Sequence, residues 1–182
     1  MVAGTEVDVH AVHIPNGIQH GWAKIDHLNA LRSAFGEARE RPQILCGDFN
    51  TPWAEIDGRI ITAAQHPSGA LRERSRSRAI SPDRPWNAEE WDRGERGVLE
   101  GLPRECGMPD AFNVRHPGKV EATWVKGRLP DERGRRLDHV FASEELAVVE
   151  CNHVHSWRRQ KLSDHSAIEV VFRLPGPERG TT

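Results

Sequence analysis

Three consecutive segments near the start of the chain constrain the fold most, because their apolar patterns change from strand to helix and back to strand. Residues 7–14 alternate between two faces, which is typical of a strand. From Trp22 to Ala38, apolar residues recur every three or four positions, which predicts an amphipathic helix that ends before Pro42. The apolar run Ile44-Leu45-Cys46 stops at Gly47, which predicts a buried central strand. This order of elements predicts an α/β layer structure.

The rest of the chain divides into a polar middle and a strand-rich end. Residues 52–109 are rich in Arg, Glu, Gly and Pro; we expect a surface loop at 72–78, with a phosphate-contacting loop as the alternative, and a short helix at 95–105. The predicted strands are Val120–Val125, Leu137–Ala142, Leu146–Val154 and a last strand with Ile168, Val170, Phe172 and Leu174 on one face. We predict a single domain over residues 1–174 and a flexible tail over 175–182.

Net charge, cysteine content and hydropathy limit the partners and the compartment that we expect for this chain. The formal net charge of −2 gives no sign of a polyanion partner, so any nucleic acid would have to be bound by local Arg clusters and a metal. The three widely spaced cysteines indicate a reducing compartment without a disulfide framework. The sequence has no apolar run long enough for a membrane span, and Met1 to Glu6 do not resemble a signal peptide. We therefore expect a cytoplasmic protein.

The first group of candidate functional residues follows the apolar strand. In Gly47-Asp48-Phe49-Asn50, the glycine permits a tight exit from the strand, so that Asp48 and Asn50 become exposed beside each other. Groups at the carboxyl ends of strands in an α/β sheet face a common crevice. The alternative is an Asx turn that only closes the strand.

Two further groups lie in the C-terminal third. Asp138, in Arg136-Leu137-Asp138-His139, sits within an otherwise apolar strand and should have a partner, either in a functional site or in an ion pair with a neighbouring Arg. Asp164 and His165 are adjacent just before the last strand, where they offer a metal ligand and a base together, with an ordinary polar turn as the alternative.

The histidines give weaker signals. His13 ends the first predicted strand, and a lone histidine is usually structural. His10 and His13 lie on opposite strand faces, which makes them a poor metal chelate. His153 and His155 share a face, but no third ligand has convincing spacing, so the sequence does not predict a zinc site.

Taken together, the motifs resemble the signatures of the endonuclease/exonuclease/phosphatase superfamily, in the same order along the chain. The resemblance rests on Gly47-Asp48-Phe49-Asn50, Arg136-Leu137-Asp138-His139 and Ser163-Asp164-His165, and it extends from about Val7 to Phe172. Thr123-Trp124 is similar to the family's aromatic motif on the substrate side. The resemblance implies a two-sheet α/β sandwich (four-layer, deoxyribonuclease-like) and hydrolysis of phosphate esters with Mg²⁺ or Mn²⁺.

The resemblance also implies individual roles. Asp48 would position or deprotonate the attacking water, Asn50 would hold the phosphate or the water, and both would lie at the metal with Asp164. His165 would be the acid–base residue, with its ring oriented by Asp138, and a carboxylate fixes an imidazole tautomer in this way. In addition, His13 could protonate the leaving group, and Asn16 and Trp124 would contact the substrate.

One part of the family pattern has no counterpart in this sequence. Family members begin with a strand that ends in asparagine and a second that ends in glutamate, and neither precedes His13 here. We therefore expect the N-terminal strands of the first sheet to be missing. An exposed sheet surface would favour self-association, and one carboxylate ligand fewer would weaken metal binding.

The sequence leaves three functions open. The leading hypothesis is a metal-dependent phosphodiesterase acting on DNA or RNA. The alternatives are a phosphomonoesterase that acts on a small or lipid-linked phosphate, and a catalytically inactive remnant that binds a partner.

Overall fold

The computed structural model describes residues 6–175, apart from residues 38, 57 and 126–133. The strands are β1 (Asp8–His13), β2 (Gln43–Asp48), β3 (Ala54–Ile56), β4 (Arg59–Ile61), β5 (Asp138–Ala142), β6 (Ala147–Val154) and β7 (Ala167–Arg173). The helices are α1 (Gly17–His20), α2 (Ala23–Phe35), α3 (Ala88–Leu99), α4 (Gly101–Glu105), α5 (Ala111–Arg115) and α6 (His155–Arg159).

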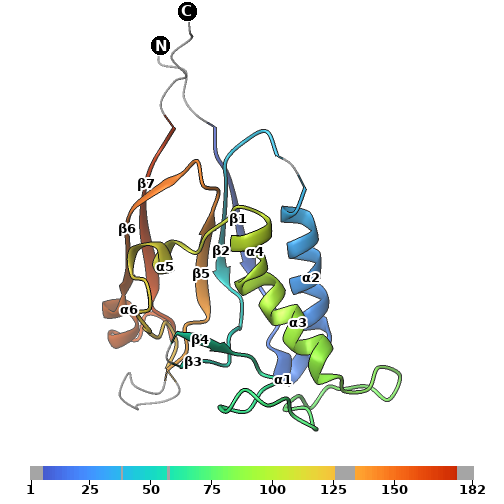
Figure 1. Cartoon of the computed structure of the whole chain (residues 1–182). Coiled ribbons are helices and arrows are strands. Elements are labelled where there is room, and N and C mark those ends of the chain that lie inside the picture. The colour runs from blue at the N-terminus through green and yellow to red at the C-terminus, as the bar shows by residue number, and fades with distance from the viewer. Residues whose placement is uncertain (1–5, 38, 57, 126–133, 176–182) are drawn as a thin grey trace, which may run out of the picture.

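The molecule is layered around a sheet in the order β1-β2-β5 (Figure 1). β1 and β2 are parallel, and β5 is antiparallel to β2. Helices α2, α3 and α4 cover one face of this sheet, while the β6–β7 hairpin and α5 lie on its other side. The chain is therefore an α/β protein with two separate main sheets, as its sequence predicts.

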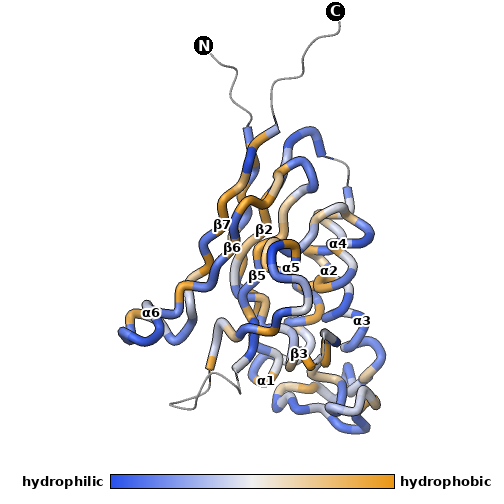
Figure 2. The backbone as a smooth tube through the Cα atoms, turned by 60° about the vertical axis from the view of Figure 1, so that its left-hand side comes forward, coloured by the Kyte–Doolittle hydropathy of each residue, from blue (hydrophilic) through white to orange (hydrophobic). Residues whose placement is uncertain are grey.

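The main core lies between the three-stranded sheet and its helices. It contains Leu45 and Phe141 from the sheet, Ile25 and Leu28 from α2, and Val98 from α3, all fully buried. A smaller cluster joins the two sheets, where Phe112 and Cys151 pack against apolar side chains of β5 and β7. The apolar parts of the chain accordingly run along the strands, and α6 and the loops at the lower end are mostly hydrophilic (Figure 2).

Most of the predicted elements are present, and two predictions were wrong. Val120–Val125 is not a strand, because only Trp124 forms isolated bridges, to Arg135 and His165. The predicted helix at 95–105 begins earlier, at Ala88, and is interrupted between α3 and α4. Asn87 causes the early start, since its side chain accepts a hydrogen bond from the Glu90 amide and caps the helix. Ala38 and residues 176–182 of the predicted tail lie outside the described residues.

One face of β1 remains open to solvent. Val9 is 64% exposed, and Val171 on β7 is 49% exposed. Self-association through this surface stays a prediction. No helix among the described residues is long and apolar enough to cross a membrane, and Cys46, Cys106 and Cys151 are free thiols.

Candidate active site

The strand register places three of the predicted residues side by side. His13 is the last residue of β1 and pairs with Asp48, the last residue of β2. Asp48 in turn pairs with Asp138, the first residue of β5. Paired residues on neighbouring strands point to the same face of a sheet, so an imidazole and two carboxylates meet at one end of the sheet. His13 Nε2 lies 3.7 Å from Asp48 Oδ2.

The end of β2 and the loop that follows it have an unusual backbone conformation. Gly47 has φ 137°, and a Cβ at this position would lie 1.9 Å from the Val12 carbonyl oxygen, so only glycine lets the two strands pair here. Asn50 adopts φ 51°, the left-handed region that asparagine tolerates. The Asn50 amide N–H donates to Asp48 Oδ1 at 2.7 Å, and its Nδ2 donates to the Ile14 carbonyl at 2.9 Å.

A buried lysine holds the loop after β2 in place. The Lys24 Nζ donates to the Asn50 carbonyl at 2.7 Å and to Glu95 Oε1 at 2.5 Å. Glu95 is fully buried, and its carboxylate also accepts from the Trp91 indole and the Ala63 amide. This ion pair joins α2 and α3 to the loop that carries Asn50.

Asp138 and His165 form a hydrogen-bonded pair. His165 Nδ1 lies 2.7 Å from Asp138 Oδ2, and His165 Nε2 lies 4.0 Å from Asp48 Oδ2. The hydrogen bond to the Asp138 carboxylate raises the pKa of His165 above its ordinary value, against the effect of burial. The sequence also allowed an ion pair between Asp138 and a neighbouring Arg, but the adjacent Arg136 pairs with Glu55 and Asp110.

Asp48 is a partly buried carboxylate that lies close to a second carboxylate, Asp138. Burial raises the pKa of Asp48, and the nearby Asp138 carboxylate raises it further, although the Asn50 amide opposes the shift. Asp48, Asp138 and His165 each offer an atom within 4.8 Å of the other two. No described residue donates to the Asn50 Oδ1 atom. A crowded pair of carboxylates with a free amide oxygen fits a hard divalent cation, which prefers oxygen ligands.

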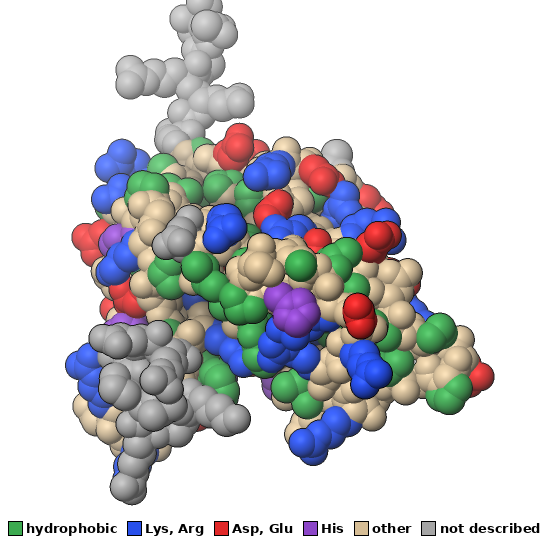
Figure 3. Space-filling model, turned by 60° about the horizontal axis from the view of Figure 1, so that its bottom comes forward, with side chains coloured by type: hydrophobic (Ala, Val, Ile, Leu, Met, Phe, Trp, Pro, Cys, Tyr) green, Lys and Arg blue, Asp and Glu red, His purple; other side chains and the backbone are tan. Residues whose placement is uncertain are grey.

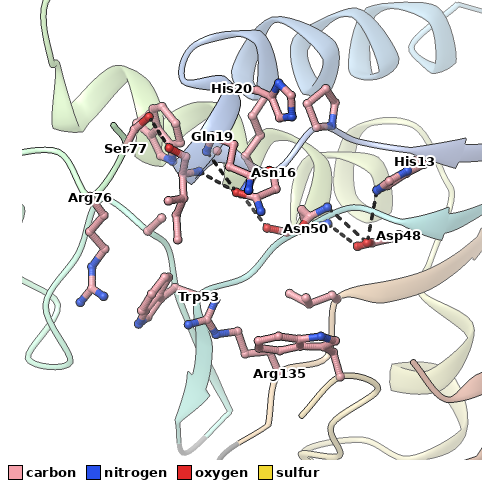
Figure 4. Close-up of a pocket in the computed structure, with 18 of the residues that line it drawn as sticks. His13, Asn16, Gln19, His20, Asp48, Asn50, Trp53, Arg76, Ser77 and Arg135 are labelled. Carbon is pink, nitrogen blue, oxygen red and sulfur yellow. Dashed lines mark hydrogen bonds and ion pairs between the residues drawn. The ribbon is translucent and has the colours of Figure 1, made fainter. Parts of the chain in front are cut away.

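All predicted site residues except Asp138 line one cavity of about 530 Å³. Figure 3 views the molecule from this end, where Lys and Arg side chains gather near a histidine in the middle of the face. Asp138 does not line the cavity but contacts His165, which does. In Figure 4, His13 and Asn50 converge on Asp48, and Trp53 and Arg135 lie across the pocket.

Three predicted residues have particular positions within this cavity. The Asn16 side-chain oxygen caps α1 and accepts from the Ile18 amide at 2.8 Å, which leaves only its NH₂ group for a ligand. Asp164 is exposed at the rim and does not belong to the close group of Asp48, Asp138 and His165. Trp124 forms part of the wall.

Sequence reasoning missed a cationic cluster on the same wall. The guanidinium carbons of Arg135 and Arg76 lie 3.6 and 3.8 Å from the centre of the Trp53 ring. Burial lowers the pKa of both arginines, and the Arg76 charge further lowers the pKa of Arg135. Neither arginine forms an ion pair with any residue in the described part of the chain. Only the alternating Arg and Ser at 72–78 hinted at this cluster.

Comparison with known proteins identifies the family of the chain. Residues 5–165 match the model of the endonuclease/exonuclease/phosphatase family. The chain belongs to this family. Enzymes of the family generally act with divalent metals, for which the cluster around Asp48 offers candidate ligands. The search of curated proteins finds no match to the sequence.

Solved structures share the fold. A family protein from Leptotrichia buccalis C-1013-b is 18% identical to this chain with a TM-score of 0.51. The matched region covers 94% of this chain and 51% of that protein. A family protein from Beutenbergia cavernae DSM 12333 is 19% identical with a TM-score of 0.53. Here the matched region covers 93% of this chain and 36% of that protein. The present chain therefore spans about half or less of the length of these two proteins.

Proposed function

We propose that the protein is a divalent-metal-dependent phosphodiesterase and that its substrate is a nucleic acid. The observation that carries this proposal is the register of β1, β2 and β5, which brings His13, Asp48 and the Asp138–His165 pair to one end of the sheet. Hydrolysis of a phosphodiester requires a base for the water, stabilisation of the phosphoryl oxygens and a proton for the leaving oxygen. The side chains at this end can supply each of these.

Each step has a residue suited to it. Asp48, whose pKa is raised, accepts a proton from the water whose oxygen forms the new bond to phosphorus. His165 in its protonated form, which the hydrogen bond to Asp138 favours, donates a hydrogen bond from Nε2 to a phosphoryl oxygen. His13, which is largely exposed, gives a proton to the leaving oxygen as its bond to phosphorus breaks.

Asp48 and Asn50 would hold Mg²⁺ or Mn²⁺, with Asp164 at the rim as a further oxygen ligand. When bound, such a cation neutralises charge on the phosphoryl oxygens and lowers the pKa of a nearby water. Lys24 contributes indirectly, because its bond to the Asn50 carbonyl keeps the amide side chain in place.

The cationic cluster supports a nucleic acid as the substrate. Arg76 and Arg135 are partly buried cations that form no ion pair with any acidic side chain in the described part of the chain, which suits them to bind further phosphates beside the one that is cleaved. Trp124 offers a flat surface on which a base of a single strand can stack. The net charge of −2 is compatible with this because the two arginines are concentrated on one wall.

The proposal is tested by cleavage of labelled single-stranded, duplex, nicked and abasic DNA in Mg²⁺, with EDTA as control. We expect EDTA-sensitive cleavage. Replacing Arg135 with Gln should weaken cleavage of DNA at least about tenfold while bis(p-nitrophenyl) phosphate, which has a single phosphate, is hydrolysed at a nearly unchanged rate. Equal losses on both substrates would refute the role of the cluster, and DNA that stays intact would refute the nuclease assignment.

A phosphomonoesterase is the second candidate, and the cavity favours it. Its volume of about 530 Å³ suits a small phosphorylated molecule. Release of inorganic phosphate from inositol phosphates or nucleotides, without cleavage of DNA, would select this function.

A further inference from the structure

A second cluster of metal-binding side chains lies outside the cavity described above. Glu121 precedes Thr123, His153 lies near the end of β6, and His155 begins α6. Glu121 lies more than thirty positions before the two histidines in the sequence, and each of the three residues offers a ligand atom within 4.8 Å of the other two. None of the three lines the main cavity.

We propose that Glu121, His153 and His155 form a zinc site. Zinc takes imidazole nitrogen and carboxylate oxygen at about 2.0–2.2 Å in a tetrahedral arrangement, so neighbouring ligand atoms stand about 3.3 Å apart. Here His155 Nε2 lies 2.9 Å and His153 Nδ1 lies 3.3 Å from the same oxygen, Glu121 Oε1. These two separations are close to the tetrahedral value, and the three ligand atoms all lie within 4.8 Å of one another.

His153 supplies an observation that is independent of this spacing. Its side chain is fully buried, and neither ring nitrogen has a hydrogen-bond partner among the described residues. Two unsatisfied buried nitrogens are costly in a folded protein. The ring is held by Phe112, on which it stacks at 4.2 Å and 7°, and this fixes Nδ1 toward Glu121. A metal ion would satisfy the nitrogen that faces the carboxylate.

The protonation states suit a metal ligand. Burial lowers the pKa of His153 to about 4, so the ring is neutral near pH 7 and has a free lone pair. Glu121 is ionised, since its contacts with Lys119 and His155 lower its pKa despite burial. Lys119 pairs with the other carboxylate oxygen, Oε2, and thus leaves Oε1 to face the histidines.

Neighbouring groups orient the ligands as they do in known metal sites. His155 Nδ1 lies 2.8 Å from the Ser166 hydroxyl, so its Nε2 points to Glu121. Two imidazoles with one carboxylate favour Zn²⁺ over Mg²⁺ or Ca²⁺, which prefer oxygen ligands alone. Three protein ligands leave a fourth position for water. Ser166 follows His165 directly, so the ion would brace the segment that carries this catalytic candidate.

Sequence patterns do not indicate this site because Glu121 is remote from both histidines along the chain. His153 and His155 alone cannot form a zinc site. The folded chain brings the glutamate to them because the Ser166 amide bonds to the Thr123 carbonyl at 2.8 Å, which aligns the two segments.

The site is tested by titrating chelator-treated protein with Co²⁺, which absorbs visible light when tetrahedral, and displacing it with Zn²⁺. An Asp48→Asn variant disables the main cluster, and Glu150→Gln is a matched control on an exposed position of β6. We expect binding in the wild type and in both of these variants, and at least about tenfold weaker binding in Glu121→Gln and His155→Gln.

Nitrogen NMR of the imidazoles provides a second measurement that needs no substitution. Zn²⁺ should shift His153 Nδ1 and His155 Nε2 in the wild-type protein. Absence of Co²⁺ binding, equal affinity in Glu121→Gln, or loss of all binding in Asp48→Asn would overturn the proposal. Loss of binding in Asp48→Asn would mean that the ion belongs to the main cluster. Absence of Co²⁺ binding in the wild type would mean that the three residues form only hydrogen-bonded ion pairs.

Discussion

Replacing Lys24 with Met should destabilise the protein strongly, because this lysine compensates the buried Glu95 carboxylate. Lys24 is 3% exposed and Glu95 is not exposed at all. Methionine keeps the length of the side chain but leaves a buried negative charge with only the Trp91 indole and the Ala63 amide as donors. Breaking a buried ion pair in this way costs about 3–5 kcal/mol. For a chain of this size, this corresponds to a fall in Tm of roughly 6–20 °C.

The double variant Lys24→Met/Glu95→Gln separates the two contacts of the lysine. Neutralising the carboxylate should restore most of the stability and leave about 1–2 kcal/mol for the Asn50 carbonyl that has lost its donor. The loop that carries Asn50 should stay loosened, so hydrolytic activity should remain low in the double variant although it is folded.

Urea unfolding followed by tryptophan fluorescence and far-UV circular dichroism measures these free energies. The matched control is Arg104→Met, which breaks the exposed Arg104–Glu100 pair and should cost less than about 1 kcal/mol. A Lys24→Met variant as stable as the Arg104→Met variant would refute the reasoning, since Glu95 would then not depend on the lysine.

Further predictions concern the site and the open sheet face. Asp138→Asn removes the interaction that raises the pKa of His165, so the alkaline limb of the activity profile should move to lower pH, and an unmoved limb in pH–rate profiles would contradict this. Gly47→Ala should cost more than about 2 kcal/mol in urea unfolding because its Cβ meets the Val12 carbonyl, whereas Gly58→Ala, with φ +73° and open space around its Cβ, should cost clearly less. The exposed face of β1 should cause self-association that increases with concentration in sedimentation velocity, and a monomer at every concentration would exclude it.

Local sequence patterns predicted the elements that carry the site. The helix from Trp22 and the strand Ile44–Cys46 depend on periodicity and apolar runs, which neighbouring residues determine. The motif around Asp48 could be assigned to a strand end for the same reason. The closeness of Asp48 to Asp138 could be expected only from the family resemblance, because the local sequence of either segment does not determine which strands pair.

Contacts between distant loops could not be predicted in this way. Val120–Val125 has an apolar alternating pattern but forms only bridges at Trp124, because its neighbours in space are single residues and not a strand. The Arg76–Trp53–Arg135 cluster joins three loops, and Glu121 reaches His153 from another segment. Such contacts depend on the tertiary fold and leave no periodic signal.

The central claim is that Asp48 and the Asp138–His165 pair act as one hydrolytic centre. The most direct test is the rate of hydrolysis of bis(p-nitrophenyl) phosphate in Mg²⁺ by the wild type, Asp48→Asn, Asp138→Asn and the double variant. Residues that act as a unit are not additive, so each single variant should lose at least about 100-fold and the double variant little more. Single variants that retain the wild-type rate, or losses that multiply in the double variant, would contradict the account.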